Sequence, residues 1–286
     1  MKTVLEVLQS GAAFLGRKGV EQSRLNMEHL LAHVLGLKRL ELYLQFDRPL
    51  AESELAPLRS LIERRAGGEP LQHVLGTVEF SRHVFRCDRR ALVPRLETEE
   101  LVEKVMARLK RAAQPPRSIM DMGCGSGVIG LSLACGFPEA RVTLVDISPE
   151  ALELARENAQ ALGILDGRVG IVESDLFERV PKHLRFEAVV ANLPYIPASE
   201  IPNLSREVRH DPLRALEGGE AGTEIIERFV RAVPEFLEGN GLVALEVGFG
   251  QGKTVSVAFE QAGWSSIDLL KDLAGRERFV FARAKG

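Results

Sequence analysis

Hydrophobic positions in the first part of the chain recur every three or four residues, as they do along an amphipathic helix. The first such series consists of Leu5, Leu8, Ala12 and Leu15. A second helix is expected to begin with Ser23 as its N-cap and to stop at Gly36, and a third is expected over about 52–66. Because no strand pattern interrupts residues 1–68, we expect the chain to begin with a small helical bundle.

A predicted hairpin and a further helix follow the bundle. Residues 75–93 contain short alternating apolar runs, which predict a β-hairpin that connects two domains. The next segment, TEELVEKVMARLKRAA, has helical spacing, and Thr98 is its candidate N-cap. The expected division is therefore a helical domain over 1–74, a hairpin linker over 75–94 and an α/β domain over 95–286.

From residue 118 onward, short apolar runs alternate with helical segments. The first five runs that we expect to be strands are 118–122, 141–145, 169–172, 188–191 and 242–247. Alternation of this kind predicts βαβ units, and hence a parallel sheet with helices on both faces. The two final runs, 267–270 and 278–282, are joined only by the short segment KDLAGRE. A parallel pair needs a longer crossover, so the last strand should run antiparallel.

A glycine-rich loop follows the first predicted strand of this sheet. The segment DMGCGSGVIGLSLA spans residues 121–134, and its three spaced glycines suit a tight turn into a helix. Such a turn brings backbone N–H groups close to a ligand. The GxGxG spacing by itself leaves a nicotinamide-binding Rossmann loop as a rival. Asp146 ends the second strand about 20 residues further on, where a carboxylate can accept both hydroxyl protons of a ribose.

Composition and charge narrow the functional classes. Of the 286 residues, 45% are apolar and 27% are charged, as in an ordinary globular protein. The formal net charge of −3 argues against a general nucleic-acid binder, and no apolar run approaches the roughly 20 residues that cross a bilayer. The three cysteines form no CxxC pair and the six histidines show no metal-ligand spacing, so we expect a cytoplasmic protein without a bound metal.

The fourth predicted strand of the sheet ends in the tetrapeptide NLPY. Ligands of open α/β sheets bind at the carboxyl ends of the strands, which is where Asn192 is expected. The Asn192 side-chain oxygen and the Leu193 main-chain carbonyl can each accept one N–H bond, and the Tyr195 ring can stack on a planar group. Together with Pro194, these residues can hold a planar –NH2 group and stabilise positive charge on its nitrogen as that nitrogen forms a new bond. We therefore take all four as candidate catalytic residues.

The mostly parallel sheet with an antiparallel last strand resembles the fold of class I S-adenosylmethionine-dependent methyltransferases. In that class a carboxylate at the position of Asp121 contacts the methionine part of the cofactor, whose ammonium and sulfonium charges suit an acidic loop. The resemblance also implies that Asp175 bonds the adenine amino group and that Leu176 or Phe177 packs on the ring. The residues expected to bind S-adenosylmethionine are Asp121, Gly123, Cys124, Gly125, Ser126, Gly127, Asp146, Asp175, Leu176 and Asn192.

Three longer stretches resemble the release-factor glutamine N5-methyltransferases, the HemK family. They are GGEPLQHVLGTVEF at 67–80, LVPRLETEELVE at 92–103 and LEGGEAGTEIIERFV at 216–230. This resemblance covers essentially the whole chain. It implies methyl transfer from S-adenosylmethionine to the glutamine amide in the GGQ motif of class 1 peptide chain release factors. The partner is then a protein that docks with help from the helical domain, and neither stable nucleic-acid binding nor membrane binding is expected.

Some residues depart from the family pattern. Leu193 replaces the first proline of the usual NPPY, and Leu96 stands where the linker usually has proline. Because NLPY is also common in the ribosomal RNA adenine dimethyltransferases, adenine N6-methylation of RNA or DNA remains the alternative. A cofactor-binding protein that has lost catalysis is a third hypothesis. Arg95, Glu97 and Glu99 either begin a solvated helix or, by resemblance, order the linker over the cofactor pocket.

Overall fold

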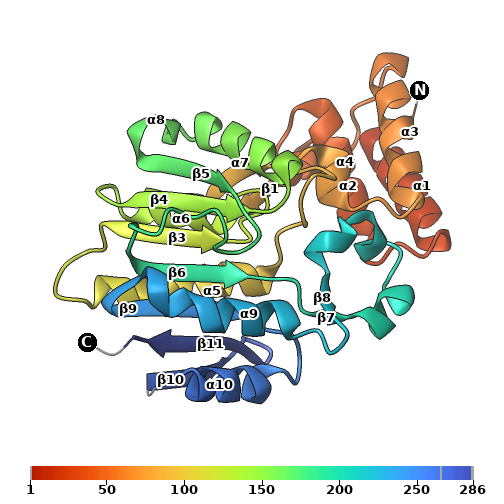
Figure 1. The fold of residues 1–286 in the computed structure, drawn as a ribbon. Coiled ribbons are helices and arrows are strands. Elements are labelled where there is room, and N and C mark those ends of the chain that lie inside the picture. Colours follow the sequence, from red (N-terminus) through yellow and green to blue (C-terminus); the bar gives the residue numbers. More distant parts are fainter. Residues whose placement is uncertain (1, 265, 285–286) are drawn as a thin grey trace. The chain divides into compact units, whose positions relative to one another are not determined.

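The computed structural model describes residues 2–264 and 266–284, and the chain forms two compact units. One unit consists of Met1–Thr77 together with Ser205–His210, and the other of Val78–Leu204 together with Asp211–Gly286. Each has its own hydrophobic core. Figure 1 shows that the amino-terminal segment is helical and that the sheet lies in the later part of the chain.

The described part of the first unit is built of helices, as its sequence pattern predicts, apart from the start of the hairpin and an isolated bridge between Thr3 and Pro49. Its helices are α1 (Val4–Arg17), α2 (Ser23–Leu35), the 3-10 helix η1 (Arg39–Leu44), α3 (Glu52–Ala66), α4 (Leu71–Leu75) and, from the later segment, the 3-10 helix η3 (Val208–His210). The predicted cap by Ser23 is wrong, because α2 starts at this residue and Gln22 precedes it in the left-handed conformation without a side-chain cap. Gly36 ends α2 with a φ of 64°, a value that favours glycine.

A short segment from much later in the sequence, Ser205–His210, packs as part of the first unit. Arg65 is 5% exposed, and its guanidinium group donates to Glu207 Oε2 at 2.5 Å. Arg206 donates to the Gly67 carbonyl oxygen at 2.6 Å, just beyond the carboxyl end of α3. The paired charges are 142 positions apart in the sequence, so no local pattern predicts that they meet.

The predicted hairpin is confirmed. It consists of β1 (Thr77–Phe80) and β2 (His83–Arg86), which pair in a two-stranded sheet. Ser81 and Arg82 turn the chain with φ values of 47° and 66°, the left-handed conformations that a two-residue hairpin turn requires.

The second unit is built on a seven-stranded sheet in the order β10-β11-β9-β6-β3-β4-β5 (Figure 1). Its strands are β3 (Ser118–Met122), β4 (Arg141–Asp146), β5 (Val169–Glu173), β6 (Phe186–Asn192), β9 (Leu237–Glu246), β10 (Ser266–Lys271) and β11 (Glu277–Arg283). β3 pairs in parallel with β4 and β6, whereas β11 runs antiparallel to β9 and β10. The predicted class I methyltransferase sheet, with its antiparallel last strand, is therefore confirmed.

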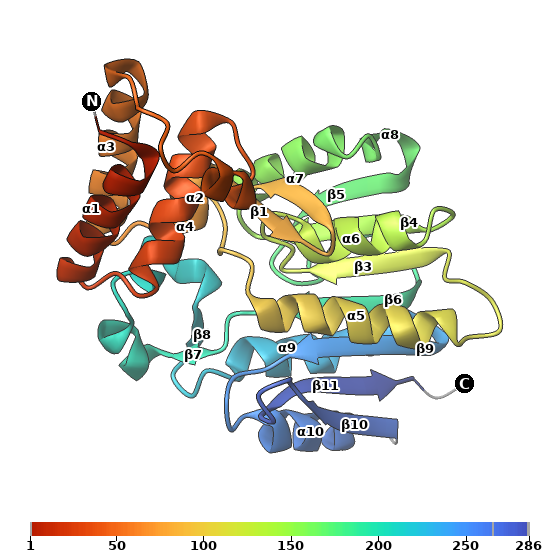
Figure 2. The ribbon, with the colours of Figure 1, turned by 180° about the vertical axis from the view of Figure 1, so that it is seen from behind.

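Helices cover both faces of the sheet (Figures 1 and 2). Alternate residues of the central strands pack against these two layers. Ile119 and Val142 pack in a core with α5, α6 and α7, whereas Met120 and Val189 pack in another with α9 and α10. These helices are α5 (Leu96–Lys110), α6 (Val128–Gly136), α7 (Pro149–Ala161), α9 (Glu224–Ala232) and α10 (Gly252–Gln261). Shorter elements are α8 (Leu165–Arg168), β7 (Ile196–Pro197), η2 (Ala198–Asn203), η4 (Leu213–Ala215), β8 (Glu217–Gly219) and η5 (Val233–Phe236). Burial on both faces explains why the strands read as continuous apolar runs.

Candidate active site

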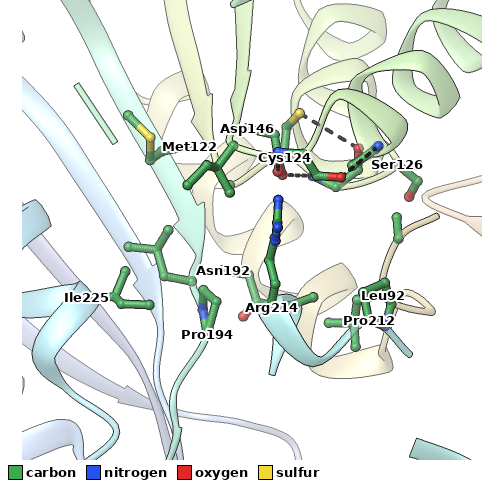
Figure 3. A pocket seen from close by; sticks show the side chains of 18 of the residues that line it. Leu92, Met122, Cys124, Ser126, Asp146, Asn192, Pro194, Pro212, Arg214 and Ile225 are labelled. Carbon is green, nitrogen blue, oxygen red and sulfur yellow. Dashed lines mark hydrogen bonds between the residues drawn. The ribbon is translucent and has the colours of Figure 1, made fainter. Parts of the chain in front are cut away.

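A cavity of about 1560 Å³ lies at the carboxyl ends of β3, β4 and β6, and all its lining residues belong to the second unit. Drug-sized ligands occupy pockets of about 300–1000 Å³, so this cavity has room for a nucleoside-sized group and a second, smaller one. Figure 3 shows part of its lining. The predicted site residues that line it are Gly123, Cys124, Gly125, Ser126, Asp146, Asp175, Leu176, Asn192, Leu193 and Pro194; Asp121, Gly127 and Tyr195 do not.

The glycine loop has a backbone that other residues would adopt only with strain. Gly123, Gly125 and Gly127 have φ values of 68°, 53° and 81°, all in the left-handed region. A Cβ on Gly127 would also lie 3.2 Å from the Cβ of Ala155 on α7. The Cys124 N–H donates to the Val145 carbonyl oxygen at 2.9 Å, which fastens the loop to β4.

Asp146, at the end of β4, accepts a hydrogen bond on each carboxylate oxygen. Oδ2 accepts from the Gly125 N–H at 2.8 Å, and Oδ1 accepts from the Ser148 N–H at 2.9 Å. Burial raises the pKa of Asp146, while these bonds and the nearby charge of Arg214 oppose the rise. Figure 3 shows the Arg214 side chain reaching through the cavity toward Asp146. Each carboxylate oxygen has a further lone pair, so the geometry is compatible with ribose binding.

Asp121 lies behind the loop and not at the cavity. Its side chain is fully buried, Oδ2 accepts from the Gly130 N–H of α6 at 2.8 Å, and Oδ1 has no hydrogen-bond partner. Burial raises the pKa of Asp121 to about 7. A Cβ on Gly130 would lie 2.9 Å from the Asp121 Cβ, so a side chain there would disturb the contact. Asp121 therefore fastens α6 to β3, and this geometry does not support a direct contact with a cofactor.

The loop after β5 brings two of its three predicted residues to the cavity. Arg228 of α9 donates to Asp175 Oδ2 at 2.9 Å. Leu176 has a φ of 47°, an uncommon conformation for leucine. Phe177 packs instead in the core, where its ring stacks on Phe236 with the centroids 4.6 Å apart. Of the two candidates for contact with adenine, only Leu176 lies at the cavity.

Leu193 and Tyr195 have different surroundings within the tetrapeptide. The Leu193 side chain is buried against the glycine loop, since a Cβ on Gly123 would come within 3.0 Å of its Cδ2. The Tyr195 ring lies beside Gly248, and its hydroxyl is directed at Glu246 Oε1 over 3.4 Å. Burial raises the pKa of Tyr195, so the hydroxyl stays protonated. Stacking of Tyr195 on a substrate remains a prediction.

Thr98 occupies a place that the sequence did not suggest. Its predicted role as an N-cap is wrong, because α5 begins at Leu96 after the N-cap residue Arg95. The Thr98 hydroxyl donates to Glu246 Oε2 at 2.7 Å and accepts from Asn192 Nδ2 at 3.0 Å. Glu246 is the single charged residue in the apolar run LVALEV. That isolated charge is the signal from which the contact could have been suspected.

The glycine-rich stretch around Gly218 packs directly on the backbone of the tetrapeptide. β8 pairs in parallel with β7, which follows the tetrapeptide. A Cβ on Gly218 would lie 2.6 Å from the Pro194 carbonyl oxygen, and a Cβ on Gly222 would lie 2.5 Å from that of Tyr195. Gln251 Nε2 also donates to the Tyr195 carbonyl oxygen, at 2.8 Å. The turn is therefore held by close backbone contacts that only glycine permits and by a side-chain hydrogen bond from Gln251.

Hydrogen bonds join residues of the predicted linker, and Arg95 just after it, to other parts of the second unit. Asn158 of α7 donates from Nδ2 to the Ser126 carbonyl oxygen at 2.9 Å and accepts on Oδ1 from the Arg86 N–H at 2.7 Å. Arg95 donates to the buried carboxylate of Asp211 at 2.7 Å. This ion pair favours the interpretation in which Arg95 orders the linker over the one in which it begins a solvated helix.

A candidate metal cluster and a membrane-crossing helix are absent from residues 2–264 and 266–284. Within these ranges, no group of three or more His, Cys, Asp or Glu side chains is placed to hold a metal ion. None of the helices described there combines the length and hydrophobicity that a membrane crossing requires.

Two family descriptions and several solved structures match the chain. Residues 6–76 match the PrmC N-terminal domain, and residues 98–219 match the methyltransferase small domain. A methyltransferase from Pyrococcus furiosus is similar in fold, with a TM-score of 0.51 and 15% identity over 71% of this chain and 89% of that chain. A 16S rRNA methyltransferase from T. thermophilus has a TM-score of 0.53 and 17% identity over 73% of this chain and 50% of that chain. At these identities the likeness concerns the fold alone.

Curated relatives match nearly the whole length. The release factor glutamine methyltransferase of Geobacter sulfurreducens is 40% identical over 282 residues, which cover 98% of this chain and 96% of the relative. The protein of the same name from Deinococcus radiodurans is 39% identical over 281 residues, which cover 98% of each. With its class I fold and its NLPY turn at the edge of a parallel sheet, this chain belongs to the release factor glutamine methyltransferase family.

Proposed function

We propose that this chain transfers the methyl group of S-adenosylmethionine to the side-chain amide nitrogen, N5, of the glutamine in the GGQ motif of class 1 peptide chain release factors. The observation that carries this function is one cavity lined both by the glycine loop with Asp146 and by Asn192, Leu193 and Pro194. The names of the full-length relatives support glutamine over adenine as the acceptor. Release factors act in translation, so the reaction takes place in the cytoplasm.

The residues around the glycine loop fit the cofactor. The left-handed glycines let a ligand approach the backbone closely. Asp146 would hold the ribose hydroxyls, and Asp175 and Leu176 would border the adenine. S-adenosylmethionine has no phosphates, and a wall that contains carboxylates suits its ammonium and sulfonium charges. When bound, it supplies an electrophilic methyl group.

The chain's own task is to orient a poor nucleophile, because the lone pair of an amide nitrogen is delocalised. Asn192 Oδ1 and the Leu193 carbonyl oxygen accept the two N–H bonds of the glutamine amide. These acceptors aim the nitrogen and stabilise its positive charge as the N–C bond forms. The S–CH3 bond of the cofactor would break as the N–C bond forms, so that a neutral thioether would leave. The nitrogen then loses one proton to water, when it is most acidic, so no strong base is needed beforehand.

An assay with methyl-labelled cofactor tests the function on three acceptors. They are a whole release factor, the same factor with the GGQ glutamine replaced by alanine, and total RNA. We expect label in the first acceptor only. Label in RNA would instead support adenine methylation, and cofactor binding without any transfer would support a binding protein that has lost catalysis.

The helical unit is expected to contact the release factor outside its GGQ loop. Leu40 and Leu44 on η1 are 69% and 87% exposed, which offers apolar surface to a protein partner. A whole release factor should therefore show a lower KM than a peptide that contains only the GGQ loop. Equal KM values for the two acceptors would argue against this docking role.

Asp146→Ala should weaken S-adenosylmethionine binding by about 1.5–3 kcal/mol, because charge-assisted hydrogen bonds are lost. Calorimetry on the folded variant measures the effect. Glu153→Ala removes an exposed carboxylate from α7 and is the matched control, with unchanged affinity expected. Normal binding by Asp146→Ala would exclude the ribose role.

Asn192→Ala should bind cofactor nearly normally and lose about 10²–10³ in kcat, the scale of one preorganised transition-state contact. Leu193→Pro should retain most activity, since proline keeps the main-chain carbonyl. Leu193→Ala should lower the affinity for the cofactor by a larger factor than it lowers kcat, because the leucine side chain packs on Gly123. Steady-state kinetics and calorimetry separate these effects. Loss of glutamine methylation in Leu193→Pro, with robust RNA methylation by the parent, would favour the adenine function.

Gly218→Ala should lower kcat by about 10²-fold, because its Cβ must displace the Pro194 carbonyl and a misplaced site costs about that much. Cofactor affinity should change little. Gly170→Ala on β5 is the control, since its nearest neighbour would lie at 3.7 Å. Equal kcat values for the two alanine variants, with native circular dichroism, would contradict the tight packing of Gly218 on the turn.

A further inference from the structure

A chain of buried hydrogen bonds lies behind the candidate catalytic asparagine. Asn192 Nδ2 donates to Thr98 Oγ1 at 3.0 Å, and Thr98 Oγ1 donates to Glu246 Oε2 at 2.7 Å. The three residues come from β6, α5 and β9, and Thr98 and Glu246 are only 3% and 1% exposed. Thr98 and Asn192 also line the cavity, whereas Glu246 lies behind them.

The direction of these bonds follows from the number of protons available. An ionised carboxylate only accepts hydrogen bonds, and a hydroxyl has a single proton to donate. Thr98 must therefore give its proton to Glu246, which leaves only lone pairs for Asn192. Asn192 in turn must present its NH2 group to Thr98, so that Oδ1 is the atom left for a ligand in the cavity.

We propose that Thr98 and Glu246 are positioning residues of the methyl-transfer site, which hold the Asn192 amide with its oxygen toward the glutamine amide. The identity of the substrate in this assignment rests on the proposed function. The order of the hydrogen bonds does not, since it follows from the contacts themselves. If the Asn192 amide were turned over, two NH2 groups would face each other and the glutamine would lose an acceptor. The charge on Glu246 thus determines the orientation of the Asn192 amide, to which it is linked through Thr98.

The protonation of Glu246 gives the arrangement a dependence on pH. Burial raises the pKa of Glu246 to about 7, although hydrogen bonds and a neighbouring cation oppose the rise. A neutral Glu246 can donate to Thr98, which frees the Thr98 proton for Asn192 Oδ1 and lets the Asn192 amide flip. The catalytic rate constant kcat should therefore rise as the pH increases through about 7. The groups that face Glu246 are Glu97 and Thr98 of α5, Tyr195 after β6 and Arg278 of β11.

Thr98→Val keeps the shape of the side chain and removes the hydroxyl. We expect kcat to fall about tenfold, the scale of one hydrogen bond, with an unchanged dissociation constant for the cofactor. Thr98→Ser should restore kcat, and Thr254→Val on the exposed face of α10 should leave it unchanged. In an Asn192→Ala background, Thr98→Val should cause no further loss, because its effect passes through the asparagine. Additive losses would show a merely structural role and overturn the assignment.

A pH series provides the second readout. The rise in kcat near pH 7 should be present in the parent and absent from Glu246→Gln, which has no carboxylate to titrate. The side-chain NH2 resonances of Asn192 should shift over the same pH range in the parent only. This nuclear magnetic resonance measurement needs no methyl transfer, so it tests the positioning of Asn192 by Thr98 and Glu246 separately from the identity of the substrate. Asn192 resonances that do not respond to pH or to Glu246→Gln would overturn the positioning role.

Discussion

The parallel pairing of β3 with β4 on one side and β6 on the other determines where the parts of the site lie. In this register Met122 of β3 is opposite Val145 of β4 and Ala191 of β6. The residues that follow these three positions are therefore brought to one edge of the sheet. These residues are Gly123, which begins the glycine loop, Asp146 and Asn192. All three line one cavity although they are far apart in sequence. A slip of one residue would turn each side chain to the other face.

Close approach of backbones is the second constraint on the site. Gly123 leaves space for Leu193, and Gly218 leaves space for the Pro194 carbonyl. Because the missing side chains are what allow these approaches, the two glycine-rich segments are parts of one packing arrangement. The turn that presents the candidate acceptors is thus held by the cofactor loop on one side and by β8 on the other.

Two buried carboxyl groups behind the cavity each fasten a helix to a strand of the sheet. Asp121 fastens α6 to β3, and Glu246 fastens α5 to the end of β9 through Thr98. Burial raises the pKa of each to about 7. Burying a charged carboxylate is unfavourable unless polar contacts compensate for the lost hydration. The hydrogen bonds that these two groups accept provide this compensation and also hold the helices in place. In both cases the acid acts on a neighbouring element rather than on a ligand.

Local patterns in the sequence were enough for the architecture and for the location of the site. Helical spacing, apolar runs and the short KDLAGRE connection determined the bundle, the hairpin, the parallel sheet and its antiparallel last strand. Strand ends placed Asp146 and Asn192 at one edge, because parallel strands end together. Each of these inferences depends on residues that are neighbours in the chain.

Only the tertiary structure decided how the site is held together. It placed Asp121 behind the loop, Phe177 in the core and Thr98 against Asn192, and it joined Ser205–His210 to the helical unit. Thr98 and Asn192 are 94 positions apart, and Thr98 and Glu246 are 148 apart. Contacts over such separations depend on which strands pair and which helix covers them, so periodicity along the chain carries no record of them.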